Sequence, residues 1–175
     1  MKVGTRSLLF GVHQFIWHPM AVYMAWLKLY GRPSIKEIIC IIIHDWGYWG
    51  CPNMDGVEGE KHPEFAARIA GKLFGEGYYN LCLLHSRHYA RNAGLEPSQL
   101  CWADKLSMLY EPCWFYLVRA RLSGELREYR KVAAIAGFMP LAATDKQWFY
   151  WVKSRLVKLG SERRNSVAYA NPARN

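Results

Sequence analysis

Apolar side chains return every three or four positions through most of the chain, which is the spacing of an amphipathic helix. The first such repeat follows His18–Pro19 and comprises Val22, Ala25, Trp26 and Leu29. Proline is tolerated at the first helical position because its missing N–H would have no partner there. The pattern therefore predicts a helix that begins at His18–Pro19 and ends before Gly31–Arg32–Pro33.

The next helix carries a start signature of its own. Ser34 and Glu37 have the spacing of a capping box, in which each side chain accepts a hydrogen bond from the other residue's backbone N–H. The apolar run 38–43 follows directly, which indicates a buried helix. This helix would deliver His44 and Asp45 at its C-terminal end.

The rest of the chain continues in the same helical period. Further helices are expected from His62–Pro63 to Gly75, over 77–91, from Pro97–Ser98 onward, over about 113–135 with a break at Ser123–Gly124, and over about 144–159 after a loop at 137–144. No segment alternates with period two, and no internal repeat is visible. We predict an all-α single domain, a bundle of about seven helices over residues 1–160, with a polar tail at 161–175.

Composition agrees with one folded domain. The 175 residues are 51% hydrophobic and 15% aromatic, which is enough for one substantial core. No apolar stretch reaches the 18 or more residues of a membrane-spanning helix, and the N-terminus shows no cleavage-site pattern. The five cysteines are odd in number and lack CxxC spacing, so we expect buried reduced thiols and a cytoplasmic protein.

Charge is unevenly distributed along the chain. Residues 1–112 hold 11 Lys/Arg against 10 Asp/Glu, whereas residues 113–175 hold 12 against 4. The basic region is either a solvated surface or a positive field that attracts an anionic substrate or nucleic acid, and we favour the solvated surface for the distal tail. The aromatic residues of this region fit a core or a homo-oligomer contact better than a nucleic-acid platform.

The chemistry is concentrated in the first two thirds of the chain. His44 and Asp45 form an adjacent pair at the mouth of the buried segment, where an ionised carboxylate is costly unless something compensates its charge. All six histidines lie before residue 89, and Asp104 stands inside an apolar stretch. Imidazole nitrogens and carboxylate oxygens are natural metal ligands, so we predict a metal site built from several helices.

The expected ligands are His18, His44, Asp45, His62, His85 and Asp104. They are separated by about one helix and one loop each, so five elements contribute them. Adjacent side chains on a helix diverge by about 100°, so His44 and Asp45 are not expected to bind side by side on one metal face, although both can reach a cavity at a helix end. A carboxylate can bridge two ions about 3.5–4 Å apart. One ion would take His18, His44 and Asp104, and the other His62 and His85, with Asp45 between them.

This ordered H…HD…H…H…D series resembles that of the HD-domain superfamily of metal-dependent phosphohydrolases, over roughly residues 10–112. The resemblance implies hydrolysis of phosphoesters by a metal-activated hydroxide, with two divalent ions (Mn, Fe, Mg, Co, Ni or Zn). One departure concerns the cyclic-dinucleotide phosphodiesterases of this superfamily. Gly47–Tyr48 replaces their Gly-Lys step, and their Gly-Tyr-Pro signature is absent.

Residues beside the ligands are candidates for catalysis and substrate binding. His13 is an alternative to His18 as the first ligand, and His18 is preferred because of its His-Pro helix start. Beside the bridging Asp45, we expect catalytic roles for His88 and Lys105, although the charge on Lys105 also fits a solvated helix surface. The substrate-binding candidates are Tyr48, Trp49, Lys61 and Arg87, the first three on the connection 46–61 that follows the His-Asp pair.

The expected function is hydrolysis of a small nucleotide phosphoester. A mixed-valent di-iron oxygenase of the same superfamily would resemble this ligand set equally well. A nucleotide-binding protein without turnover is a third hypothesis, which the complete ligand set argues against. Cleavage of nucleic acid is a fourth and rests on the basic C-terminal region.

Overall fold

The computed structural model describes the backbone of residues 1–54 and 57–170, and side chains as far as residue 163. This part of the chain contains helices and no strands, which confirms the all-α prediction. The α-helices are α1 (Val3–Phe10), α2 (Trp17–Tyr30), α3 (Ile35–Ile43), α4 (Val57–Glu60), α5 (Pro63–Phe74), α6 (Glu76–Leu83), α7 (Arg87–Asn92), α8 (Gln99–Ser107), α9 (Cys113–Ser123), α10 (Glu125–Ile135) and α11 (Asp145–Ala170). Two short 3-10 turns, η1 (Trp46–Tyr48) and η2 (Met108–Tyr110), complete the description.

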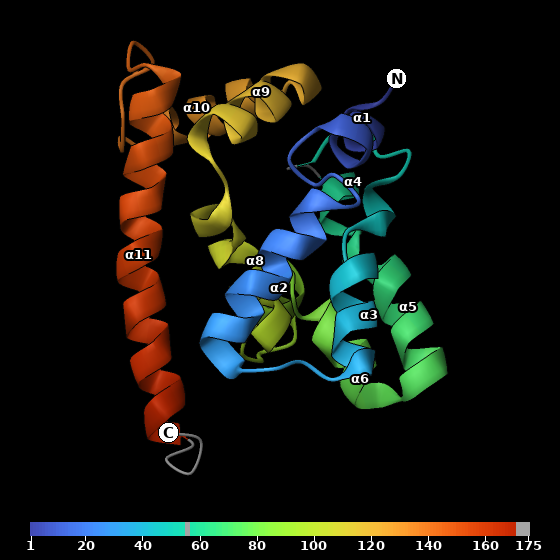
Figure 1. Ribbon diagram of the computed structural model, residues 1–175. Coiled ribbons are helices and arrows are strands. Elements are labelled where there is room, and N and C mark those ends of the chain that lie inside the picture. The colour runs from blue at the N-terminus through green and yellow to red at the C-terminus, as the bar shows by residue number, and fades with distance from the viewer. Residues whose placement is uncertain (55–56, 171–175) are drawn as a thin grey trace.

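The helices pack around α2 and α8, which lie against each other in the middle of the molecule (Figure 1). On one side α3, α5 and α6 form a layer, in which α5 and α6 are an antiparallel pair. On the other side α11 runs along the flank, while α9 and α10 cross one end beside α1. Trp26, Ile41, Leu100 and Phe149 are almost completely buried between these layers and form the centre of the core.

Most predicted helix boundaries are confirmed. Ser34 and Glu37 form the capping box of α3. His62 is the N-cap residue of α5, with Pro63 at the first helical position. The break between α9 and α10 falls at Gly124, whose φ of 90° is easily adopted by glycine alone. α2 begins one residue earlier than expected, so His18 lies inside its first turn.

Three expectations about the elements were wrong. The continuous helix over 77–91 is two helices, α6 and α7, because Ser86 accepts a hydrogen bond from the His88 N–H and starts a new helix. The connection 46–61 contains η1 and α4. α11 continues to Ala170, beyond the expected end near 159, and the last five residues of the predicted tail lie outside the described residues. Because of these additional short helices, the described part of the chain contains more helices than the seven or so that were expected.

Four of the five free cysteines are buried, as their apolar surroundings predict, and Cys113 is partly exposed. Within the described residues, no helix combines the length and the apolar character that crossing a membrane requires.

Candidate metal centre

The six predicted ligand residues converge on one place. α2 supplies His18 from its first turn, His44 and Asp45 follow the end of α3, and His62 precedes α5. His85 lies in the bend after α6, and Asp104 projects from α8. Asp104 keeps 31% of its side chain exposed, while the other five residues are buried. Helix ends and the body of α8 therefore gather side chains that are up to 86 residues apart in sequence.

One group of ligand atoms comprises His18, His44, Asp104 and one oxygen of Asp45. Nε2 of His18 lies 3.1 Å from Oδ2 of Asp45 and 3.1 Å from Oδ1 of Asp104. Nε2 of His44 lies 3.2 Å from the same Asp45 oxygen and 3.3 Å from Nε2 of His18. All these atoms lie within 4.8 Å of one another, which suits ligands around one ion.

His44 and Asp45 thus face the same group side by side, contrary to expectation. The 100° divergence applies within a helix, and α3 already ends at Ile43. The backbone turns at Asp45, with φ of −96° and ψ of −1°, and this turn brings its carboxylate back beside the His44 ring.

The second group comprises His62, His85 and the other oxygen of Asp45. Oδ1 of Asp45 lies 3.6 Å from Nε2 of His62 and 3.7 Å from Nε2 of His85. The two histidine Nε2 atoms are 2.9 Å apart. Asp45 therefore stands between the two groups and presents a different oxygen to each of them.

Three of the four histidines are held by the same local hydrogen bond. Nδ1 of His44, His62 and His85 donates to the carbonyl three residues earlier, at Ile41, Gly59 and Cys82, over 2.8, 2.6 and 2.5 Å. A carbonyl oxygen only accepts, so Nδ1 carries the proton and Nε2 carries a lone pair when the ring is neutral. Such hydrogen bonds fix the orientation of metal-binding histidines.

This arrangement fits a bound cation. The lone pairs of His62 and His85 face each other at 2.9 Å, which is repulsive unless a positive charge lies between them. Oδ2 of Asp45 is buried and has no hydrogen-bond donor aligned on it. A buried carboxylate oxygen without a donor is costly, and coordination to a metal ion would compensate it.

Electrostatics favour the protonation states that ligands need at Asp45, Asp104 and His62, but not at His44. Burial opposes ionisation of Asp45 and Asp104, but the neighbouring histidines outweigh it and lower the pKa of both carboxyl groups well below the usual range. Burial together with His85 lowers the pKa of His62 to about 3, so this ring is neutral at pH 7. Burial also opposes a charge on His44, but Asp45 and Asp104 raise its pKa well above 6.5. An incoming ion would therefore displace a proton from His44.

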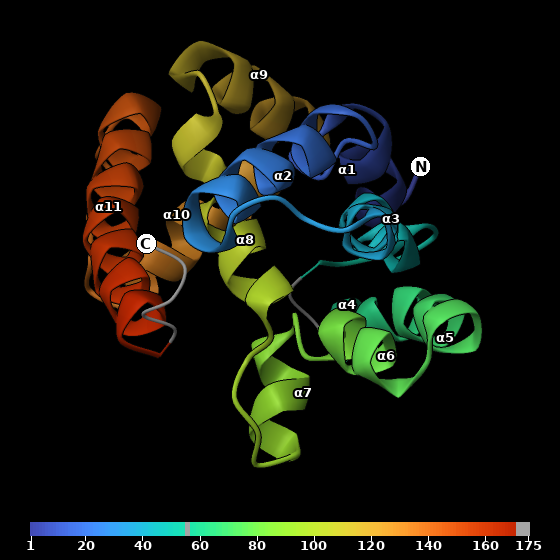
Figure 2. The same cartoon turned by 60° about the horizontal axis from the view of Figure 1, so that its bottom comes forward.

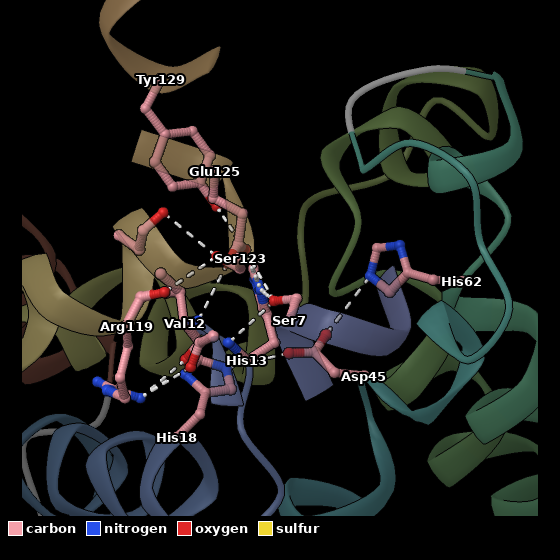
Figure 3. Close-up of polar contacts among 12 residues, drawn as sticks. Ser7, Val12, His13, His18, Asp45, His62, Arg119, Ser123, Glu125 and Tyr129 are labelled. Atoms are coloured by element: carbon pink, nitrogen blue, oxygen red, sulfur yellow. Dashed lines mark hydrogen bonds and ion pairs between the residues drawn. The ribbon is translucent and has the colours of Figure 1, made fainter. Parts of the chain in front are cut away.

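His13 belongs to neither ligand group and is held by a different network (Figure 3). Its Nδ1 donates to Oε1 of Glu125 over 2.9 Å, and Ser7 donates to the same oxygen over 2.8 Å. The His13 ring packs edge-on against the ring of His18, with centroids 5.2 Å apart. Of the two alternatives for the first ligand, the structure places His18 in the cluster and His13 beside it.

Sequence analysis missed Glu125, which is 2% exposed at the start of α10. Besides His13 and Ser7, it accepts hydrogen bonds from Ser123 and from the backbone N–H of Val12. It lies in the basic C-terminal third, 112 residues from His13, and nothing in its neighbourhood along the chain indicated this role. Glu125 connects the C-terminal helices to the wall of the ligand cluster.

A pocket of about 190 Å³ opens over the ligand cluster. Among the substrate-binding and catalytic candidates, Tyr48, Arg87 and His88 line it. Its lining also includes Glu60, Ser86 and Arg91.

The other three candidates lie elsewhere. Lys61 is exposed and outside the lining of this pocket, and Lys105 lines a separate groove beside α11. Trp49 is 60% exposed and stacks on Phe15, with centroids 6.3 Å apart. The ring of Tyr48 stacks flat on the ring of His62, with centroids 3.9 Å apart. This face of Tyr48 supports the candidate metal ligand His62 and is therefore closed to a substrate base.

Comparison of the chain with protein-family models, with curated proteins and with solved structures found no match in any of the three. The similarity to an HD-type centre therefore rests on the order of the ligands and on their geometry. The buried His/Asp cluster is compatible with such a centre and could bind metal ions.

The Glu125 carboxylate should contribute stability in a defined pH range. Burial raises the pKa of Glu125, but hydrogen bonds from His13, Ser123 and the Val12 N–H outweigh it and lower the pKa from 4.5 to about 2. A carboxyl group whose pKa is lowered by folding stabilises the fold at pH values above its pKa in the unfolded chain. This stability is lost as pH falls from about 4.5 to about 2. The shift corresponds to about 3 kcal/mol.

We therefore expect Glu125→Gln to lower the free energy of unfolding at pH 7 more than at pH 3, as measured by urea denaturation. Glu128→Gln is the control, because Glu128 is exposed on the same helix and forms an ion pair with Lys131. Equal destabilisation by Glu125→Gln at both pH values would show that the charge of Glu125 does not stabilise the fold.

Proposed function

We propose that the protein is a metal-dependent phosphohydrolase with an HD-type centre for two divalent ions. The observation that carries the proposal is the position of Asp45, whose two oxygens are divided between two groups of histidine ligands. This is the arrangement expected of a carboxylate that bridges two ions. A single ion would use only one of these groups and would leave the other histidines facing each other.

The residues around the centre suit a phosphate. Two bound ions would supply Lewis acidity and lower the pKa of a coordinated water to near neutrality. Arg87, His88 and Arg91 lie on one short helix and line the pocket over the cluster. Guanidinium groups bind phosphate oxygens through paired, charge-assisted hydrogen bonds. These side chains would hold the phosphoryl group while Asp45 and the histidines hold the ions.

The size of the pocket bears on the substrate. Pockets for complete drug-sized ligands enclose roughly 300–1,000 Å³, and about 190 Å³ accommodates a phosphoryl group with little else. The remainder of a nucleotide would lie at the rim, outside the cluster. We retain a nucleotide phosphoester as the proposed substrate, with its phosphate in the pocket and its base outside.

The direct test uses metal-stripped protein loaded in turn with Mn, Fe, Mg, Co, Ni or Zn. Phosphomonoesters, phosphodiesters and nucleoside triphosphates are assayed for phosphate release or ester cleavage. Hydrolysis that appears on loading and disappears with a chelator is the expected result. Absence of hydrolysis with every ion, together with oxygen uptake by the iron-loaded protein, would replace this proposal with the oxygenase hypothesis.

Placement of the basic residues predicts a ranking among variants. Arg87→Ala should raise KM or lower kcat/KM for a phosphoester by about ten- to a hundredfold, because it removes a charge-assisted bond to the phosphate. Lys61→Ala should leave both constants nearly unchanged, since Lys61 is exposed outside the pocket. Steady-state kinetics of the two variants at equal metal content make this comparison. A larger effect of Lys61→Ala than of Arg87→Ala would refute this assignment of the phosphate site.

A further inference from the structure

Several basic side chains that line the metal pocket or a second hollow beside α11 form no ion pair with any carboxylate in the described part of the chain. They are Arg87 and Arg91 on α7, Lys105 on α8, and Arg155 and Lys158 on α11. Repulsion among unpaired cations costs stability, so their concentration on one region is a feature that a bound anion would explain.

Lys105, Arg155 and Lys158 line a second hollow, a groove of about 520 Å³ between α8 and α11. The half-buried Trp151 lines the same groove beside these basic residues, and the acidic Glu162 also lines it. Arg155 packs over the Trp151 ring at 5.2 Å, which holds both side chains at the groove. Cations combined with an aromatic ring are the usual components of a surface that binds a nucleic-acid strand.

The groove and the metal pocket meet on α8. Asp104 lines the pocket and the next residue, Lys105, lines the groove. In Figure 2, α8 lies between α11 and the helices that surround the metal pocket. The positive charges therefore continue from one hollow into the other.

We propose that the groove between α8 and α11 binds single-stranded nucleic acid and leads one of its phosphodiesters into the metal pocket. Its cations would contact successive phosphates. A single strand is favoured over a duplex because a phosphate must enter a pocket of about 190 Å³, and a flexible strand can bend into it. The cleavage part of this inference rests on the proposed function, whereas binding in the groove does not.

The test compares two double variants of the full chain, both in an Asp45→Asn background so that the strand is not cut. Arg155→Gln with Lys158→Gln removes two groove charges. Arg32→Gln with Lys72→Gln is the matched control, because both of these residues are exposed and lie away from the groove. Binding of labelled single-stranded DNA and RNA oligonucleotides is followed by fluorescence anisotropy at several salt concentrations.

The groove variant should weaken binding at least about tenfold at low salt. Each lost phosphate contact reduces the magnitude of the slope of log affinity against log salt by about 0.7, so the slope should change by about 1.4. The control should keep the slope of the parent. Equal effects in the two double variants would overturn the proposal, as would equally tight binding of a nucleoside triphosphate at the same site.

A kinetic comparison without the Asp45→Asn change separates this proposal from the proposed function. The groove variant should lower kcat/KM for an oligonucleotide about tenfold and leave a small phosphoester unaffected. Groove-dependent binding without hydrolysis of any ester would refute the phosphohydrolase and retain the binding site. Hydrolysis of small esters without groove-dependent binding would refute the binding site and retain the phosphohydrolase.

Discussion

Asp45→Asn should lower kcat by about a thousandfold or more while the helices remain folded. Asp45 is the one residue that both ligand groups share, and its two oxygens face different histidines. An amide offers a single neutral oxygen and an NH₂ group, so it cannot supply negative charge to two ions. A bound ion contributes several kcal/mol to the transition state, and about 4 kcal/mol corresponds to about a thousandfold in rate.

The measurement is kcat on the best substrate of the metal panel, with far-ultraviolet circular dichroism to establish the fold. Asp145→Asn is the matched control, since it makes the same change at an aspartate that binds Arg121 and Arg130. It should retain the parental rate. A parental rate in Asp45→Asn with metal still bound would place the chemistry elsewhere in the molecule.

The convergence of the candidate ligands could be predicted in part, because His44 and His62 sit at helix ends that local sequence determines. The capping box at Ser34 defines the start of α3, and the apolar run determines where His44 emerges. Pro63 similarly places His62 at a helix start. Once helices of these lengths pack around one core, their ends meet, so the order of the ligands along the chain was sufficient to expect one site.

The bend at 84–86 has a local cause that the helical apolar pattern hides, because Ser86 caps a new helix there. Features that depend on packing between distant segments could not be predicted. Glu125 is such a feature, since three of its partners, Ser7, Val12 and His13, lie more than 100 residues earlier in the chain. A glutamate at the start of a basic amphipathic helix is ordinarily exposed, and only tertiary contacts bury this one.

The same limitation applies to the candidates Lys61 and Lys105, which the structure places outside the lining of the pocket. Lys61 precedes His62 in sequence, yet Nδ1 of His62 bonds to the Gly59 carbonyl and the lysine remains exposed outside the pocket lining. Lys105 follows Asp104 but lines the groove beside α11. Neighbouring positions on a helix point in different directions, so proximity in sequence to a ligand does not place a side chain in its pocket.

The two ligand groups should be separable by single substitutions. The metal-loaded protein should hold two divalent ions per chain, because each group contains at least three ligand atoms within 4.8 Å. His18→Asn should empty the group formed with His44 and Asp104, and His85→Asn should empty the group formed with His62. Each variant should then retain one ion and lose at least about a hundredfold in kcat, since the second ion supplies several kcal/mol to the transition state.

Elemental analysis after removal of free metal counts the ions, and electron paramagnetic resonance of the Mn-loaded protein reports whether two of them are coupled. His88→Asn is the control, because His88 lines the same pocket and belongs to neither ligand group. It should keep two ions and change only substrate kinetics. One ion per chain in the unmodified protein would refute the dinuclear centre. His62 and His85, whose Nε2 atoms lie 2.9 Å apart, would then serve as pocket residues.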